Sequence, residues 1–146
     1  MAMMKKRMTL AIAESCTGGL ISNRITNVSG CSKYFMGAVI TYSNESKENL
    51  LGVSKESIER HGAVSKQVAL EMAAGIKHFA CVDIGMGVTG IAGPTGGTKS
   101  KPVGLVFIAL VTDKKCIVKK LRFTGSREEI KFQASQVALD MLRRNI

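Results

Sequence analysis

Residues 10–19 of this chain are Leu10-Ala-Ile-Ala-Glu-Ser-Cys-Thr-Gly-Gly19, an apolar run that passes directly into a polar, glycine-containing segment. The apolar run, residues 10–13, predicts a buried strand, and residues 20–28 have the apolar spacing of an amphipathic helix. In open α/β sheets, ligands bind at the carboxyl ends of the strands, which is where this segment would lie. The free N–H groups at the start of the helix also suit a phosphate or an oxyanion.

The later strands are predicted from runs of β-branched and apolar residues. Two such runs cover residues 34–43 and 82–91, and residues 103–112 and 116–124 have the pattern of a hairpin. With helices between and after the strands, the order of elements is β-α-β-α-α-α-β-β-β-α. This order predicts an α/β fold, a three-layer α/β/α sandwich with a mixed sheet, in a single domain over residues 1–146.

Four helices after the first are predicted from polar residues that can cap them. Asn44 precedes a helix at residues 45–51, Ser54 and Ser65 precede two more, and Ser126 forms a capping box with Glu129. The helices after Ser65 and Ser126 each have an apolar face. The residues expected to be buried on these faces are Val68, Ala69, Met72, Ala73, Ile76 and Phe79, and Ile130, Ala134, Val137, Ala138, Met141 and Leu142.

The charge and composition restrict the partners of the protein. Its formal net charge is +10, but the basic residues occur in short, scattered groups, which indicates a solvated basic surface that also attracts a small anionic substrate. Trp is absent and aromatic residues make up only 5%, which argues against a base-stacking platform for single strands. We therefore expect no nucleic-acid partner. Nucleic-acid binding is the alternative that the charge motivates, and the salt dependence of DNA or RNA binding tests it.

The cysteines and histidines show no pattern of a metal site. The four cysteines contain no Cys-x-x-Cys pair and the two histidines are far apart, so we expect no metal and no other cofactor. The basic start of the chain is followed by too short an apolar stretch for a signal peptide, and no run is long enough to span a membrane. These features predict a cytoplasmic protein with reduced thiols.

Ser15 is the candidate nucleophile, because it lies at the predicted strand-to-helix turn. The N–H groups of Thr17, Gly18 and Gly19 could hold the oxyanion that forms when an amide is attacked. The alternative is that Ser15 or Thr17 merely caps the helix. Cys16 is a rival nucleophile, but neighbouring side chains at a strand end face opposite ways, and a buried apolar cysteine is the commoner case.

A base for Ser15 must come from elsewhere in the chain. No histidine lies near the polar segments, so a serine–lysine pair is the better hypothesis. Tyr42 and Lys47 follow the second strand and could both face the carboxyl edge of the sheet. Lys47 would have to lose its charge through burial or nearby cations. The alternatives are an exposed helix lysine and a core tyrosine whose hydroxyl lies at the rim.

Phosphate binding is predicted for the segment Gly90-Ile-Ala-Gly-Pro-Thr-Gly-Gly97. Its backbone N–H groups could form an anion nest, with Gly90, Gly93, Thr95, Gly96 and Gly97 as the contributing residues. The alternative is a tight turn between strands. Arg127, at the start of the last helix, is a second candidate for phosphate, although such arginines are more often solvated. Glu14 could orient Lys47, hold a ribose hydroxyl or support the loop, and we expect the ribose or the support role.

Three ordered blocks resemble the CinA C-terminal domain, the nicotinamide mononucleotide deamidase family. They are Glu14-Ser-Cys-Thr-Gly-Gly19, Gly37-Ala-Val-Ile-Thr-Tyr-Ser-Asn44 with Lys47 and Leu51-Gly-Val53, and Thr89-Gly-Ile-Ala-Gly-Pro-Thr-Gly-Gly-Thr98 with Lys101-Pro-Val-Gly104; the linking Gly62-Ala-Val-Ser65 also agrees. The resemblance covers nearly the whole chain. It implies an α/β/α sandwich, usually a homodimer, in which Ser15, Tyr42 and Lys47 meet at the active site.

The resemblance implies an amidohydrolase that converts nicotinamide mononucleotide to nicotinic acid mononucleotide and ammonia, within the pyridine nucleotide cycle. Ser15 would attack, with Lys47 as base and Tyr42 assisting proton transfer. The alternative function is a catalytically silent nucleotide-binding or regulatory module. The intact set Ser15, Tyr42 and Lys47 favours the enzyme.

Overall fold

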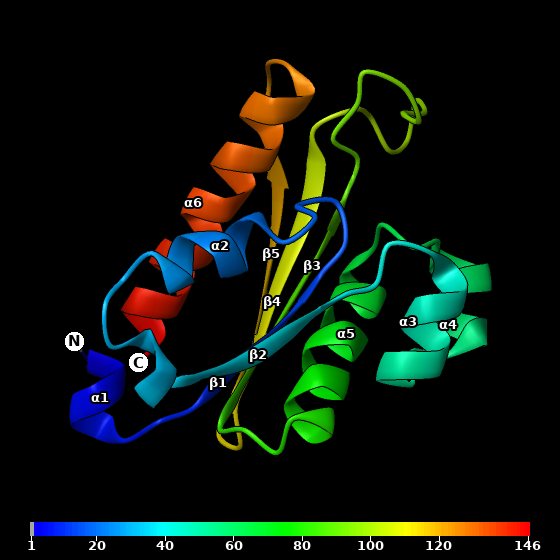
Figure 1. The fold of residues 1–146 in the computed structure, drawn as a ribbon. Coiled ribbons are helices and arrows are strands. Elements are labelled where there is room, and N and C mark those ends of the chain that lie inside the picture. Colours follow the sequence, from blue (N-terminus) through cyan, green and yellow to red (C-terminus); the bar gives the residue numbers. More distant parts are fainter. Residues whose placement is uncertain (1) are drawn as a thin grey trace.

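The computed structural model describes residues 2–146 as a five-stranded sheet with helices on both faces (Figure 1). The strands are β1 (Leu10–Glu14), β2 (Phe35–Ile40), β3 (Ile84–Gly90), β4 (Leu105–Val111) and β5 (Cys116–Arg122). Their order across the sheet is β2-β1-β3-β4-β5. β1 is parallel to both of its neighbours, whereas β4 is antiparallel to β3 and β5, so the sheet is mixed.

The helices form the two outer layers. One face of the sheet carries α1 (Ala2–Lys6), α2 (Leu20–Thr26) and α6 (Arg127–Asn145), and the other carries α3 (Asn44–Leu51), α4 (Lys55–His61) and α5 (Lys66–Phe79) (Figure 1). A short 3-10 helix, η1 (Cys31–Lys33), precedes β2. The predicted three-layer α/β/α sandwich is confirmed. None of the helices within residues 2–146 is long and apolar enough to cross a bilayer.

The side chains of β1 alternate between the two cores. Leu10 and Ile12 pack with the apolar residues of α2 and α6, whereas Ala11 and Ala13 pack with α5. The α5 side needs small residues because this helix lies directly on the strands. A Cβ added to Gly85 of β3 would lie 2.0 Å from the Ala73 carbonyl oxygen of α5, so no larger residue fits there.

The structure corrects two details of the predicted helices. Ser43, not Asn44, caps α3, because its extended backbone lets its Oγ accept a hydrogen bond from the Ser46 N–H at 3.1 Å. Phe79 is 61% exposed, since it is the last residue of α5, and Val82 in the following link packs with Ile76 instead. The predicted caps of α4, α5 and α6, including the capping box, are confirmed.

The ends of three parallel strands define one edge of the sheet. β1 ends at Glu14, β2 at Ile40 and β3 at Gly90, and all three run in the same direction. β2 is shorter than the predicted strand at 34–43, so residues 41–43 leave the sheet and form the link to α3. The turn after β1, this link and the glycine-rich loop after β3 therefore lie together at the carboxyl edge.

Candidate active site

A cleft of about 260 Å³ lies at this edge. Its walls come from the turn after β1, the start of α3, the link before α5, the loop after β3 and the first residue of α6. Of the residues predicted from sequence, the cleft brings together Ser15, Tyr42, Lys47, Gly90, Gly93, Thr95, Gly96 and Arg127. Those that do not line it are Glu14, Thr17, Gly18, Gly19 and Gly97.

Ser15 and Lys47 form a direct pair in this cleft. The Lys47 Nζ lies 3.2 Å from the Ser15 Oγ, and the lysine is only 1% exposed. Its Nζ also lies 2.8, 3.3 and 3.5 Å from the carbonyl oxygens of the link between β2 and α3, which belong to Thr41, Tyr42 and Ser43. The alternative of an exposed helix lysine is therefore wrong.

The surroundings of Lys47 suit a neutral amine. Burial lowers the pKa of Lys47 from its ordinary value of 10.5, because an ammonium group loses its hydration there. No ion pair within residues 2–146 involves this lysine. A neutral amine has two N–H donors and one lone pair, so the carbonyls can accept the N–H groups while the lone pair accepts the Ser15 proton. The same carbonyls would then stabilise the ammonium.

Cys16 is unsuited to nucleophilic attack. Burial is the main cause that raises the pKa of its thiol to about 12, so the thiolate is scarce at neutral pH. The side chain is 6% exposed and belongs to the apolar core on the α2 side. A Cβ added to Gly90 would lie 3.1 Å from its Sγ, so Cys16 packs against the start of the glycine-rich loop.

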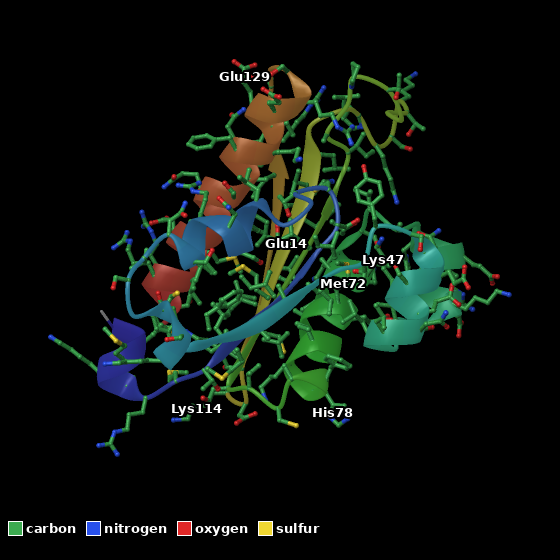
Figure 2. The ribbon with its side chains drawn as sticks, viewed as in Figure 1. Glu14, Lys47, Met72, His78, Lys114 and Glu129 are labelled. Atoms are coloured by element: carbon green, nitrogen blue, oxygen red, sulfur yellow. The ribbon has the colours of Figure 1, made fainter. Side chains whose placement is uncertain are left out.

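Glu14 supports the loop and is not available to a substrate. It is fully buried between α2 and the sheet (Figure 2). One carboxylate oxygen accepts hydrogen bonds from the Thr17 hydroxyl at 2.6 Å and from the N–H groups of Gly19 and Ile21 at 3.1 Å. The other accepts from the N–H and hydroxyl of Ser22 at 2.9 and 2.6 Å. Of the ribose and support roles expected for Glu14, these contacts fit support of the loop, because both carboxylate oxygens face donors of the protein.

The bonds of Glu14 also change the predicted oxyanion site. The Gly18 N–H donates to the Ser15 carbonyl at 3.1 Å, and the Gly19 N–H donates to Glu14, so neither glycine is free to hold an oxyanion. The buried carboxylate occupies the N-terminus of α2, whose N-cap is Gly19 and not Ser15 or Thr17. Within residues 2–146, no hydrogen bond is made by the N–H groups of Cys16 and Thr17. Of these two residues only Cys16 lines the cleft, so its N–H group is the remaining candidate for the oxyanion.

Arg127 links two parts of the cleft lining, Tyr42 and the glycine-rich loop. The Arg127 guanidinium donates to the Tyr42 hydroxyl at 2.7 Å and to the Gly93 carbonyl at 2.6 Å. Tyr42 is 60% exposed, and its hydroxyl makes no hydrogen bond to Ser15 or Lys47 in the part of the chain described. The expected proton transfer through Tyr42 is therefore not supported. Its position favours a wall of the substrate cleft instead.

Only part of the glycine-rich loop lines the cleft. Gly97 lies outside, because a Cβ added there would be 2.7 Å from the Val103 nitrogen, where the chain returns to β4. Sequence reasoning considered Cys16 only as a rival nucleophile, and it did not assign to the site the lining residues Asn44, Ala63, Val64, Thr89, Ile91 and Ala92. Thr89 shows how the walls are joined, since its hydroxyl donates to the Ala63 carbonyl at 2.8 Å. Most of these residues lie inside the motif blocks, which was the available signal.

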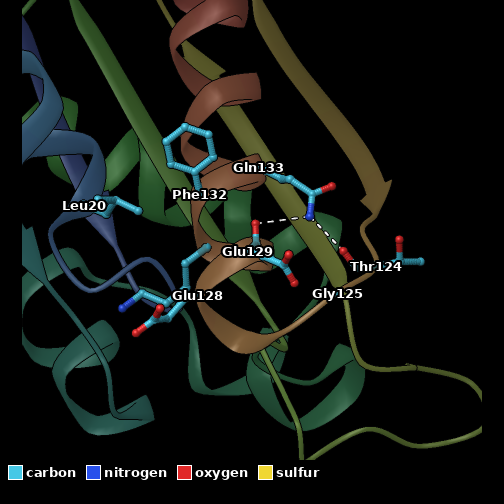
Figure 3. Close-up of a pocket in the computed structure, with 8 residues that line it drawn as sticks. Leu20, Thr124, Gly125, Glu128, Glu129, Phe132 and Gln133 are labelled. Atoms are coloured by element: carbon cyan, nitrogen blue, oxygen red, sulfur yellow. Dashed lines mark hydrogen bonds between the residues drawn. The ribbon is translucent and has the colours of Figure 1, made fainter.

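A larger hollow of about 850 Å³ lies beside the first turns of α6 (Figure 3). Its lining includes Leu20, Phe132 and Gln133 but none of the residues predicted to carry chemistry. Gln133 there donates to the carbonyls of Thr124 and Glu129 at 2.8 and 3.1 Å, which fastens the start of α6 (Figure 3). Between residues 2 and 146, no group of three His, Cys, Asp or Glu side chains is placed to hold a metal ion.

Known proteins resemble this chain over nearly its whole length. A family model described as the CinA C-terminal domain matches residues 1–146. The CinA-like protein of Kosmotoga olearia is 53% identical over 140 residues, which are 96% of this chain and 34% of that protein. The CinA-like protein of Koribacter versatilis is 53% identical over 138 residues, 94% of this chain and 33% of that protein. The chain thus spans about a third of the length of these relatives.

Solved structures agree with the fold. The competence damage-inducible protein A of Klebsiella pneumoniae superposes with a TM-score of 0.95 at 33% identity, over 99% of this chain and 89% of that one. The competence/damage inducible protein CihA of Agrobacterium tumefaciens superposes with a TM-score of 0.96 at 37% identity, over 98% and 88%. The family match, these identities and the shared fold lead to one conclusion: the chain belongs to the CinA C-terminal domain family.

Proposed function

We propose that the protein is an amidohydrolase that converts nicotinamide mononucleotide to nicotinic acid mononucleotide and ammonia. The observation that carries this proposal is the buried Lys47 Nζ, 3.2 Å from the Ser15 Oγ in a cleft. A serine paired with a buried amine supplies a nucleophile and a base, which acyl transfer requires. The nicotinamide nucleotide is the substrate that the sequence resemblance implies.

The first half of the proposed reaction transfers the acyl group to the enzyme. The Ser15 oxygen attacks the carboxamide carbon while Lys47 takes the serine proton. The N–H group of Cys16, which lines the cleft, holds the oxyanion of the tetrahedral intermediate. The carbon–nitrogen bond then breaks, and the Lys47 ammonium gives its proton to the leaving nitrogen. Ammonia departs, and the acyl group stays on Ser15 as an ester.

The second half releases the acid. Water attacks the ester carbonyl, and Lys47 takes a proton from it. The tetrahedral intermediate breaks down to nicotinic acid mononucleotide, and the proton returns from Lys47 to the Ser15 oxygen. The three carbonyls around Nζ stabilise the ammonium at both stages.

The walls of the cleft suit an anionic nucleotide. Arg127 lines it beside the glycine-rich loop, and its guanidinium keeps further N–H donors for a phosphate. Tyr42 also lines the cleft, and Arg127 links its hydroxyl to this loop. The homodimer that the resemblance implies belongs to this proposal, and light scattering tests it. The product would re-enter pyridine nucleotide synthesis.

The test is ammonia release from nicotinamide mononucleotide by the purified, metal-free protein. We expect release by the parent and a loss of about a thousandfold or more in Ser15→Ala. Ser29→Ala is the matched control, because Ser29 is exposed and does not line the cleft. Comparable release by Ser15→Ala would refute the mechanism. Binding without release by the parent would instead identify a silent nucleotide-binding module.

A further inference from the structure

Asn44 lines the cleft, but its side chain has no role in the proposed mechanism. Its place before α3 predicted a cap, but the Ser43 Oγ accepts the capping hydrogen bond, and Asn44 is the first residue of the helix. It is exposed, lines the cleft with Ser15 and Lys47, and its amide makes no hydrogen bond in the part of the chain that the structure describes. The amide is therefore free to bind a ligand.

The helix places this amide beside the reacting pair. Asn44 and Lys47 are three positions apart on α3, and side chains at this spacing are neighbours on one helix face. Lys47 contacts the Ser15 Oγ, which marks where the substrate carbonyl must lie. A primary amide offers one acceptor and two donors at any pH. This is the hydrogen-bonding complement of another primary amide.

We propose that Asn44 is a specificity residue that recognises the primary carboxamide of the substrate. The inference rests on the proposed function and identifies the chemical group of the substrate that Asn44 recognises. The Asn44 side-chain oxygen accepts a hydrogen bond from the substrate NH₂. The carboxylate product has no N–H to donate, so this oxygen would face another oxygen. Asn44 thus favours binding of the amide over the acid and promotes product release.

The test compares the affinities of nicotinamide mononucleotide and nicotinic acid mononucleotide by calorimetry in the Ser15→Ala protein, which prevents turnover. We expect Ser15→Ala to bind the amide more tightly than the acid. Adding Asn44→Ala should reduce this preference about tenfold through weaker amide binding, because one hydrogen bond is lost. Asn49→Ala is the matched control, since Asn49 is exposed on the same helix but outside the cleft.

Three results would overturn the inference. They are an unchanged preference in Asn44→Ala, an equal loss of affinity for both nucleotides, and no binding of either nucleotide. An equal loss would place Asn44 at a group that both nucleotides share, such as the ribose. Thermal unfolding separates folding defects, because Asn44→Ala leaves the Ser43 cap intact. Ammonia release by the parent is measured separately, so a shifted preference without turnover would refute the amidohydrolase alone.

Discussion

Lys47 lies in an environment that is unusual for a lysine. Lysines are almost never fully buried without a partner, yet this one has carbonyl oxygens and a serine around it and, within residues 2–146, no carboxylate partner. A carboxylate would favour the ammonium and keep the lysine charged. Carbonyl dipoles allow both forms, so the same group can accept a proton and return it. This property is what a base in acyl transfer needs.

The first prediction concerns the pH dependence of this residue. In the proposed mechanism Lys47 acts as a base only when neutral, so kcat/KM for nicotinamide mononucleotide should rise with pH. Because burial lowers its pKa, the rise should be complete below the ordinary lysine value of 10.5. Steady-state rates at pH 6 to 10 measure the profile. Lys47→Arg should lose about a thousandfold, because arginine stays protonated. Lys55→Arg, on the exposed side of α4, should match the parent.

Glu14 is the second residue with an unusual environment, because five donors converge on one buried carboxylate. Glu14→Gln would turn one acceptor oxygen into an NH₂ group that faces N–H and O–H donors. We expect a loss of about 3 kcal/mol in the free energy of unfolding, measured in urea. Glu45→Gln, exposed on α3, is the control. Parental stability of Glu14→Gln would contradict a cap made by the carboxylate.

At the scale of elements, helix termini set the positions of the chemical groups. The turn after β1 is held by a carboxylate from the strand, and the start of α3 by the Ser43 hydroxyl. The α6 terminus carries Arg127, directly after the capping box of Ser126. Each cap fixes where its helix begins. Among the candidate site residues, Ser15 precedes α2, whereas Lys47 and Arg127 lie within the first two turns of α3 and α6. Stability and geometry are therefore linked at these three termini.

Two cap variants separate the effect of a helix cap on stability from its effect on turnover. Ser43 and Ser54 cap consecutive helices with the same kind of hydrogen bond, at 3.1 and 3.2 Å. Replacing either by Ala should cost about 1 kcal/mol of stability. Only Ser43→Ala should also lower turnover, because α3 carries Lys47 and α4 lines no part of the cleft. Equal turnover in the two variants would show that the α3 cap does not position the base.

At the scale of the whole molecule, the net charge of +10 creates a positive field around the protein. The proposed substrate, nicotinamide mononucleotide, carries a phosphate that this field would attract. We expect kcat/KM for nicotinamide mononucleotide to fall several-fold between about 0.02 and 0.5 M salt, with little change in kcat. Steady-state kinetics in potassium chloride measures this, and an uncharged nicotinamide riboside is the matched control substrate. Equal salt dependence of both substrates would contradict attraction of the phosphate.

Much of the fold follows from local patterns. The strand at residues 10–14, the hairpin of β4 and β5, and the caps Ser54, Ser65 and Ser126 all agree with expectation. Apolar periodicity and capping depend on residues within a few positions of one another, so they can be inferred without a structure. The nucleophile and the polar loops were predicted for the same reason, because each lies directly after a strand.

Contacts between distant segments do not follow from local patterns, and the pair of Ser15 and Lys47 was expected only because no histidine lies near and because of the family resemblance. Lys47 reaches Ser15 across 32 positions and Arg127 reaches Tyr42 across 85, so both contacts depend on which strands are neighbours in the sheet. Two further features depend on which acceptor binds the free N–H groups at a helix start. At α2 this acceptor is the buried Glu14 carboxylate, and at α3 it is the Ser43 hydroxyl and not Asn44. Local sequence patterns predict which residues lie at the carboxyl edge of the sheet. The tertiary structure decides which of these side chains are in contact. The distances between them depend on the order of the strands in the sheet and on how tightly the helices pack against it.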